Sequence, residues 1–207
     1  MIETIDELLG EIRACTACAA HLPLGPRPVL HISATAKLLV ASQAPGTKVH
    51  AAGISFWDNS GTRLREWLGL DKAAFYDSAR VAILPVGMCY PGRLPNGGDA
   101  PPRPECARLW RARVLSAMPE LRLTLLVGGY AQAAAAAEHG WPKAAMTERV
   151  ADFRSYLPRY FPLPHPSWRT GVWERRHPWF TTEVLPALRH AVADALEQPT
   201  REPRQPG

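Results

Sequence analysis

The stretch KLLVASQAPG, residues 37–46, decides the fold. Its first part, residues 37–42, is a short apolar run of the kind found in buried strands, and the run stops at the turn signal Gln43-Ala44-Pro45-Gly46. Three similar runs follow along the chain: residues 80–86 (RVAILPV), 121–127 (LRLTLLV) and 160–164 (YFPLP). Runs this short and apolar are typical of strands covered on both faces of a parallel sheet.

Helical patterns alternate with these runs. They predict helices over residues 2–14, 60–69, 105–117, 130–138 and 179–197, the second of them capped by Ser60 and closed by Gly69. The alternation predicts an α/β fold: a single domain over residues 1–197 with a central, mostly parallel four-stranded sheet flanked by helices. Residues 198–207 are expected to form a disordered tail.

The overall composition narrows the class of protein. No run of about 18 apolar residues occurs, so we expect no membrane span. The N-terminal residues lack the basic and then apolar pattern of a signal peptide, which predicts a cytoplasmic protein. The net charge of +5 at pH 7 suits a polyanionic partner, although charge alone discriminates weakly between functions.

The chain has four cysteines, and their spacing indicates a metal site. Cys15 and Cys18 form a C-x2-C pair, while Cys89 and Cys106 follow far downstream. In the cytoplasm thiols stay reduced, so such a quartet more often binds metal than forms disulfides. Four thiolates suit either zinc or an iron–sulfur cluster. The alternative is that Cys89, at the end of an apolar run, is a buried core thiol.

Parallel sheets place their ligands at the carboxyl ends of the strands. The expected strand ends carry four features: residues 43–46, the loop with Cys89, Gly128-Gly129, and His165-Pro166-Ser167. Phe56 could stack on a planar ligand there, and His165 could polarise an oxygen that gains negative charge. The alternatives are a core phenylalanine and a solvated loop histidine.

The order of these features resembles the uracil-DNA glycosylase superfamily, specifically the iron–sulfur enzymes of its bacterial and archaeal families 4 and 5. Those enzymes show an N-terminal C-x2-C pair, a GEAPG-type first motif followed by an aromatic residue, a third cysteine after a strand, a proline-rich loop to a fourth cysteine, and a late HPS motif. The corresponding positions here are Cys15 and Cys18, residues 42–46, Phe56, Cys89, Cys106 and residues 165–167. The resemblance extends from residue 9 to about residue 190.

The resemblance implies a DNA repair enzyme. The four cysteines would hold a [4Fe–4S] cluster with a structural role, and the substrate would be uracil-containing DNA, single- or double-stranded. The uracil base would be flipped out of the stack and its N-glycosidic bond hydrolysed. A monomer associated with the bacterial nucleoid is expected.

The resemblance also assigns roles to individual residues. Phe56 would stack on uracil, and His165 would hydrogen-bond uracil O2 as the base leaves. Gln43 would be catalytic together with His165, and the backbone of residues 43–46 would complete the pocket and help to position water. The remaining expected contacts are Ala44, Gly46 and Ser167 at the base, Trp168 and Arg169 in the minor groove, and Arg175 and Arg176 near phosphates. Trp168 either fills the space left by the flipped base or packs on the domain.

The chain departs from the family pattern at three positions. Gln43 replaces the usual glutamate, and Ala44 stands where the best-known family has its catalytic aspartate, so the first motif offers no general base. Asp58 and Asp99 are the nearby alternatives. Pro85 replaces the asparagine that reads the uracil edge in family 4, and a proline has no N–H to donate.

Asn59 is the expected replacement as reader of the base, with a turn or helix-cap role as its alternative. The three departures also favour a different class of function: an iron–sulfur protein that binds DNA or senses damage with little or no glycosylase activity. A third hypothesis is a zinc-binding α/β protein unrelated to DNA.

Overall fold

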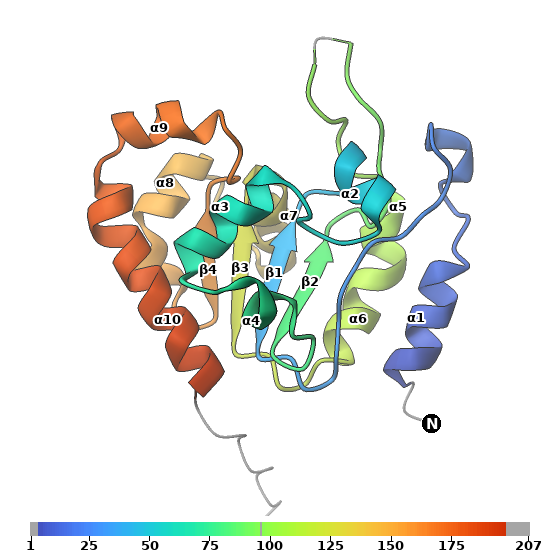
Figure 1. The fold of residues 1–207 in the computed structure, drawn as a ribbon, viewed down its shortest axis with the longest axis horizontal. Coiled ribbons are helices and arrows are strands. Elements are labelled where there is room, and N and C mark those ends of the chain that lie inside the picture. Colours follow the sequence, from blue (N-terminus) through green and yellow to red (C-terminus); the bar gives the residue numbers. More distant parts are fainter. Residues whose placement is uncertain (1–3, 96, 198–207) are drawn as a thin grey trace, which may run out of the picture.

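A four-stranded parallel sheet forms the centre of the computed structural model, which describes residues 4–95 and 97–197 (Figure 1). Its strands are β1 (Leu38–Ser42), β2 (Val81–Pro85), β3 (Leu123–Val127) and β4 (Tyr160–Leu163), in the order β2-β1-β3-β4. All three pairings are parallel. The predicted fold class is therefore confirmed. Every residue of β1, β2 and β3 is buried, which explains why these runs show no polar alternation.

Helices connect the strands and cover both faces of the sheet. The longer ones are α1 (Ile5–Arg13), α3 (Asn59–Leu68), α7 (Gly129–His139) and α10 (Leu185–Glu197). The shorter ones are α2 (Thr47–Ala52), α4 (Lys72–Tyr76), α5 (Pro104–Cys106), α6 (Ala112–Ser116), α8 (Met146–Ala151) and α9 (Thr170–Arg176). Single turns complete the set: η1 (Ala19–His21), η2 (Ala107–Arg111), η3 (Phe153–Tyr156) and η4 (Phe180–Val184).

Local signals set the ends of helix α3. Asp58 accepts a hydrogen bond from the Gly61 amide through Oδ1 at 2.9 Å, and so caps the helix. The prediction of Ser60 as the cap was wrong, because the capping carboxylate precedes it by two residues. Gly69 ends the helix at φ +68°, in the left-handed region that favours glycine, as predicted.

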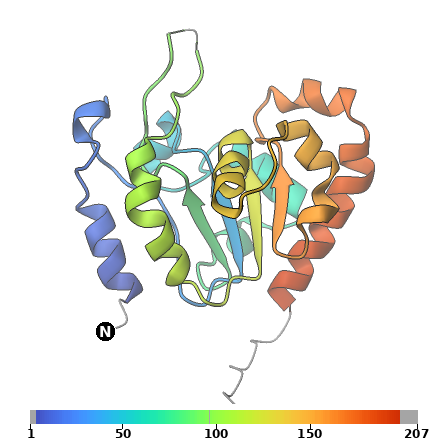
Figure 2. The same cartoon turned by 180° about the vertical axis from the view of Figure 1, so that it is seen from behind.

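The sheet separates two apolar layers. Leu38 and Val40 point toward α3 and α10, where the aromatic side chains of Phe153, Phe161 and Phe180 pack. On the other face, the alternating residue Leu39 packs toward α1 and α6 (Figure 2). No helix of the described residues is long and apolar enough to cross a membrane.

The carboxyl ends of the strands form one edge of the molecule, and a hairpin projects above it between β2 and α5 (Figure 1). Arg93 and Asp99 form an antiparallel bridge across this hairpin, and the Leu94 amide donates to the Gly98 carbonyl at 3.0 Å. The hairpin therefore has a defined backbone rather than being an open loop.

Candidate active site

A cavity of about 210 Å³ opens at the carboxyl edge of the sheet. That volume holds several water molecules, each of which occupies about 30 Å³ in the liquid. The segments after β1, after β2 and after β4 all contribute to its wall, as does the start of α3. Its polar and aromatic lining consists of Ser42, Ser55, Phe56, Asp58, Ser60, Asp99, His165 and Ser167. The cavity lies at the edge of the sheet where the sequence predicted a ligand site.

The first motif supplies backbone to the cavity. Ala44, Pro45 and Gly46 lie in the wall. Gln43 is not among the lining residues, because its side-chain amide points to the hairpin and donates to the Ala100 carbonyl at 3.1 Å. The structure thus gives Gln43 an anchoring contact that the sequence analysis did not expect.

Phe56 lines the cavity in a strained backbone conformation. Its φ is +56°, the left-handed region that a residue with a Cβ rarely adopts. The Tyr76 hydroxyl holds this turn by donating to the carbonyls of Ser55 and Phe56, at 2.9 and 3.1 Å. A Cβ on Gly61 would lie only 1.8 Å from the Phe56 oxygen, so only glycine permits this approach.

His165 lies in the opposite part of the wall, just after β4. Its carbonyl accepts hydrogen bonds from the Ser167 amide at 2.8 Å and from the Thr170 hydroxyl. Burial lowers the pKa of His165 below its ordinary 6.5, although the nearby carboxylates of Asp58 and Asp99 oppose that shift. The imidazole is therefore neutral at pH 7 and can donate one hydrogen bond from a ring N–H.

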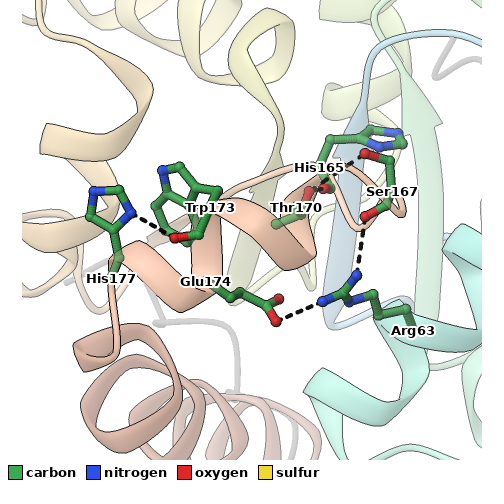
Figure 3. A network of polar contacts seen from close by, with 7 residues as sticks. All are labelled: Arg63, His165, Ser167, Thr170, Trp173, Glu174 and His177. Atoms are coloured by element: carbon green, nitrogen blue, oxygen red, sulfur yellow. Dashed lines mark hydrogen bonds and ion pairs between the residues drawn. The ribbon is translucent and has the colours of Figure 1, made fainter.

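A contact that the sequence did not predict fixes the segment after His165 (Figure 3). Arg63 of α3 donates to the Ser167 carbonyl at 3.1 Å and forms an ion pair with Glu174 of α9 at 2.6 Å. The partners are more than a hundred residues apart, 104 and 111 positions respectively, so no local sequence pattern could have indicated them.

The base-reading prediction finds no support in the position of Asn59. This residue is exposed at the start of α3 and is not among the lining residues, whereas its neighbours Asp58 and Ser60 are. Pro85 is part of the wall. The buried side chains of Ser42 and Ser55 line the cavity, so hydroxyl groups are present there instead of the side-chain amide that was expected from Asn59.

The sequence model of the uracil DNA glycosylase superfamily matches residues 31–189, which include every residue that lines the cavity except Val29. The chain belongs to the uracil DNA glycosylase superfamily. Its fold also resembles the solution NMR structure of a proposed uracil DNA glycosylase from Methanosarcina acetivorans, with 14% identity, a TM-score of 0.44, and coverage of 80% of this chain and 97% of that one. Membership in the superfamily rests on the sequence model and not on this likeness.

The surface beside the cavity suits the nucleic acid on which this superfamily acts. Trp168 is 80% exposed, and the Arg169 guanidinium lies 5.4 Å from its ring centre. Trp168 therefore does not pack into the domain. Arg175 and Arg176 are exposed in the last turn of α9. A Cβ on Gly98 would lie 4.0 Å from Arg169, so the hairpin and this loop are neighbours.

The four cysteines line a second cavity, next to α1, η1 and α5. The superfamily match covers Cys89 and Cys106 but begins after Cys15 and Cys18. Burial raises the pKa of the Cys106 thiol to about 11, and it also raises the pKa of Cys18 and Cys89. The Cys106 sulfur accepts a hydrogen bond from the Met88 amide at 3.3 Å.

The donor set fits a thiolate-bound group. Among the described residues, no three His, Cys, Asp or Glu side chains are placed to bind a single metal ion. All four cysteines line the same cavity. In an iron–sulfur cluster each cysteine ligates a different iron, so its sulfurs are farther apart than those around a single zinc ion.

Proposed function

We propose that this protein is a monofunctional DNA glycosylase that flips uracil out of DNA and hydrolyses its N-glycosidic bond, leaving an abasic site. The observation that carries the proposal is the shared cavity of Phe56 and His165, which come from distant parts of the chain and face one space at the sheet edge. An aromatic face and a neutral hydrogen-bond donor are what a flipped pyrimidine requires.

Some of the cavity residues would bind the base, and His165 would assist cleavage of the bond. Phe56 offers its ring to the base, and the hydroxyls of Ser42 and Ser55 offer hydrogen bonds to its edge. As the bond between C1′ and N1 breaks, its electron pair moves onto the base and charge develops at O2. The neutral His165 donates to that oxygen, a contribution on the order of 3–4 kcal/mol for a preorganised donor.

The surface next to the cavity would bind the DNA. Trp168 is exposed enough to enter the space left by the flipped base, which would offset unstacking. Arg169, Arg175 and Arg176 would contact phosphates.

We further propose that Cys15, Cys18, Cys89 and Cys106 hold a [4Fe–4S] cluster. When bound, the cluster supplies a structural cross-link and takes no part in hydrolysis. Its four cysteine ligands would connect the N-terminal segment to the chain before and after the hairpin. Iron and acid-labile sulfide in equal amounts in anaerobically purified protein would support the cluster, whereas zinc without sulfide would support the zinc site.

A duplex oligonucleotide with one uracil tests the enzymatic proposal. Incubation followed by alkaline cleavage should give a single break at the uracil, and the same duplex with thymine should stay intact. A panel of other damaged bases and a single-stranded substrate would define the range. A His165→Ala variant should lose activity about 100-fold or more, as the loss of one such donor does in other enzymes.

One observation favours the second candidate, a damage-binding protein without turnover. The first motif places no carboxylate in the cavity, because Ala44 lines it and Gln43 turns away. Tight binding to uracil-containing DNA with no abasic product at stoichiometric protein would support this candidate over the enzyme.

A further inference from the structure

The cavity contains a carboxylate that the first motif lacks. Asp99 comes from the projecting hairpin, yet it lines the cavity together with His165 and Gly46. A Cβ on Gly46 would lie 3.5 Å from Oδ2 of Asp99. The carboxylate therefore lies over the turn of residues 43–46 that follows β1.

Gln43 holds the hairpin in this position. Its amide donates to the carbonyl of Ala100, the residue next to Asp99, at 3.1 Å. The Ala100 amide in turn donates to the Gly92 carbonyl at 2.9 Å, which ties the two legs of the hairpin together. A glutamate at position 43 has no N–H and could not make the first of these hydrogen bonds.

The charges around Asp99 point to a role in the reaction rather than in DNA binding. Asp99 is exposed, its backbone is bridged to Arg93, and the preceding Gly98 lies next to Arg169, on a face that would approach phosphates. A carboxylate there repels the DNA backbone and weakens binding. It attracts a sugar that becomes cationic, and it can accept a proton from water. Among the described residues, none donates a hydrogen bond to this carboxylate.

Asp58 is less suited to that role. Its Oδ1 already accepts the Gly61 amide and caps α3, so one oxygen of this carboxylate is engaged in the fold. Asp99 has no such contact within residues 4–95 and 97–197.

We propose that Asp99 is the catalytic carboxylate of this protein and that Gln43 is the residue that positions it. The proposal rests on the glycosylase function above. Water bound to Asp99 adds its oxygen to C1′ as the bond from C1′ to N1 breaks, and the bond's electron pair leaves with the base. The water proton passes to Asp99 and then, through solvent, to the uracil anion. The products are an abasic sugar and neutral uracil.

Single-turnover hydrolysis of the uracil duplex tests this assignment. Asp99→Asn should lower the rate about 100-fold or more, the usual loss when a general base is removed. Its affinity for a duplex with an abasic-site analogue should stay equal or rise, because a repulsive charge is gone. Asp99→Glu, which keeps a carboxylate, should recover part of the rate. Asp194→Asn is the control, since that exposed carboxylate pairs with His190 on α10.

The Gln43→Glu variant tests whether residue 43 positions Asp99 or takes part in the reaction itself. This change restores the acid usual in the iron–sulfur families, yet it should lower the rate because the hydrogen bond to Ala100 can no longer form. The double variant with Asp99→Asn should be no slower than Asp99→Asn alone. A faster or unchanged Gln43→Glu enzyme, or full activity of Asp99→Asn, would overturn the inference while leaving the glycosylase function intact. A wild-type protein inactive on every base of the panel would instead overturn the proposed function and the inference with it.

Discussion

Two glycines leave room for the side chains that line the cavity. Gly128 has φ +86°, and a Cβ there would lie 3.3 Å from the His165 Cβ. Gly61 allows the start of α3 to approach Phe56 in the same way. Neither glycine contributes a functional group. The site still depends on both, because a side chain at either position would collide with a residue that lines the cavity.

Gly128→Ala should displace His165 and strain the backbone at the end of β3. We expect a loss of about 1–3 kcal/mol in the free energy of unfolding, because φ +86° with ψ 168° is a region that residues with a Cβ hardly ever adopt. Glycosylase activity should also fall, because the imidazole moves. Urea unfolding and the oligonucleotide assay measure the two effects. Gly10→Ala is the matched control: no atom lies within 4 Å of its added Cβ in α1, and stability should rise by about 0.5–1 kcal/mol.

The partly buried position of His165 predicts a pH dependence. Its folded-state pKa is lowered, so the unfolded chain binds the proton more readily. The contribution to stability is fully present above the ordinary pKa of 6.5 and is lost as the pH falls from there through the folded pKa. His165→Gln should therefore lose less stability than the wild type between pH 7.5 and pH 5.5 in urea unfolding. Equal losses in the two proteins would contradict the assigned burial effect.

At the scale of elements, the ion pair between α3 and α9 connects the two halves of the site. Arg63 contacts both the Ser167 carbonyl and Glu174. The other carboxylate oxygen of Glu174 is buried and has no hydrogen-bond partner among the described residues. Removing the arginine leaves that carboxylate partly buried and unpaired.

Arg63→Ala should lower the free energy of unfolding by about 1–2 kcal/mol, less than for a fully buried pair because both side chains reach solvent. Activity should drop as well, since Ser167 loses its anchor. Arg63→Ala combined with Glu174→Gln should recover part of the stability, because the uncompensated charge is gone. Additive losses in the double variant would show that the pair does not act as a unit.

The sequence predicted the elements with strong local signals. All four strands were found because each is a short, mostly apolar run between turns. Helices α2, α4, α8 and α9 were not, because they have only 6, 5, 6 and 7 residues and show too few turns for a periodic pattern.

The same limit applies to the site. His165 directly follows β4, and Phe56 lies in the connection from β1 to α3. Topology brings the carboxyl ends of parallel strands together, so their shared cavity was predictable. The roles of Gln43 and Arg63 were not, because their partners lie 57 and more than a hundred positions away (104 for Ser167) and leave no trace in local spacing.

At the scale of the whole molecule, three exposed arginines, Arg169, Arg175 and Arg176, follow the segment that contributes His165 and Ser167 to the cavity. We expect DNA binding to weaken with salt, because bound phosphates release counterions. Replacing Arg175 and Arg176 by alanine should lower affinity and reduce the slope of log K against log salt by about 0.9 for each phosphate that is no longer neutralised. Arg159→Ala, at the amino edge of the sheet beside β4, should leave both unchanged. Titrations of a fluorescent duplex over a range of salt concentrations measure this slope.

The hairpin between β2 and α5 is fastened at its base and along its length. Near its base the Gly87 amide donates to the Gln43 carbonyl at 2.9 Å, and the Met88 amide reaches Cys106 at the far end of the segment. Prolines restrict the backbone between these points. A free loop of this length would lose conformational entropy on meeting DNA. Here these contacts already order the hairpin in the free protein. Binding of a flipped base therefore does not lose affinity through the ordering of the segment that carries Asp99.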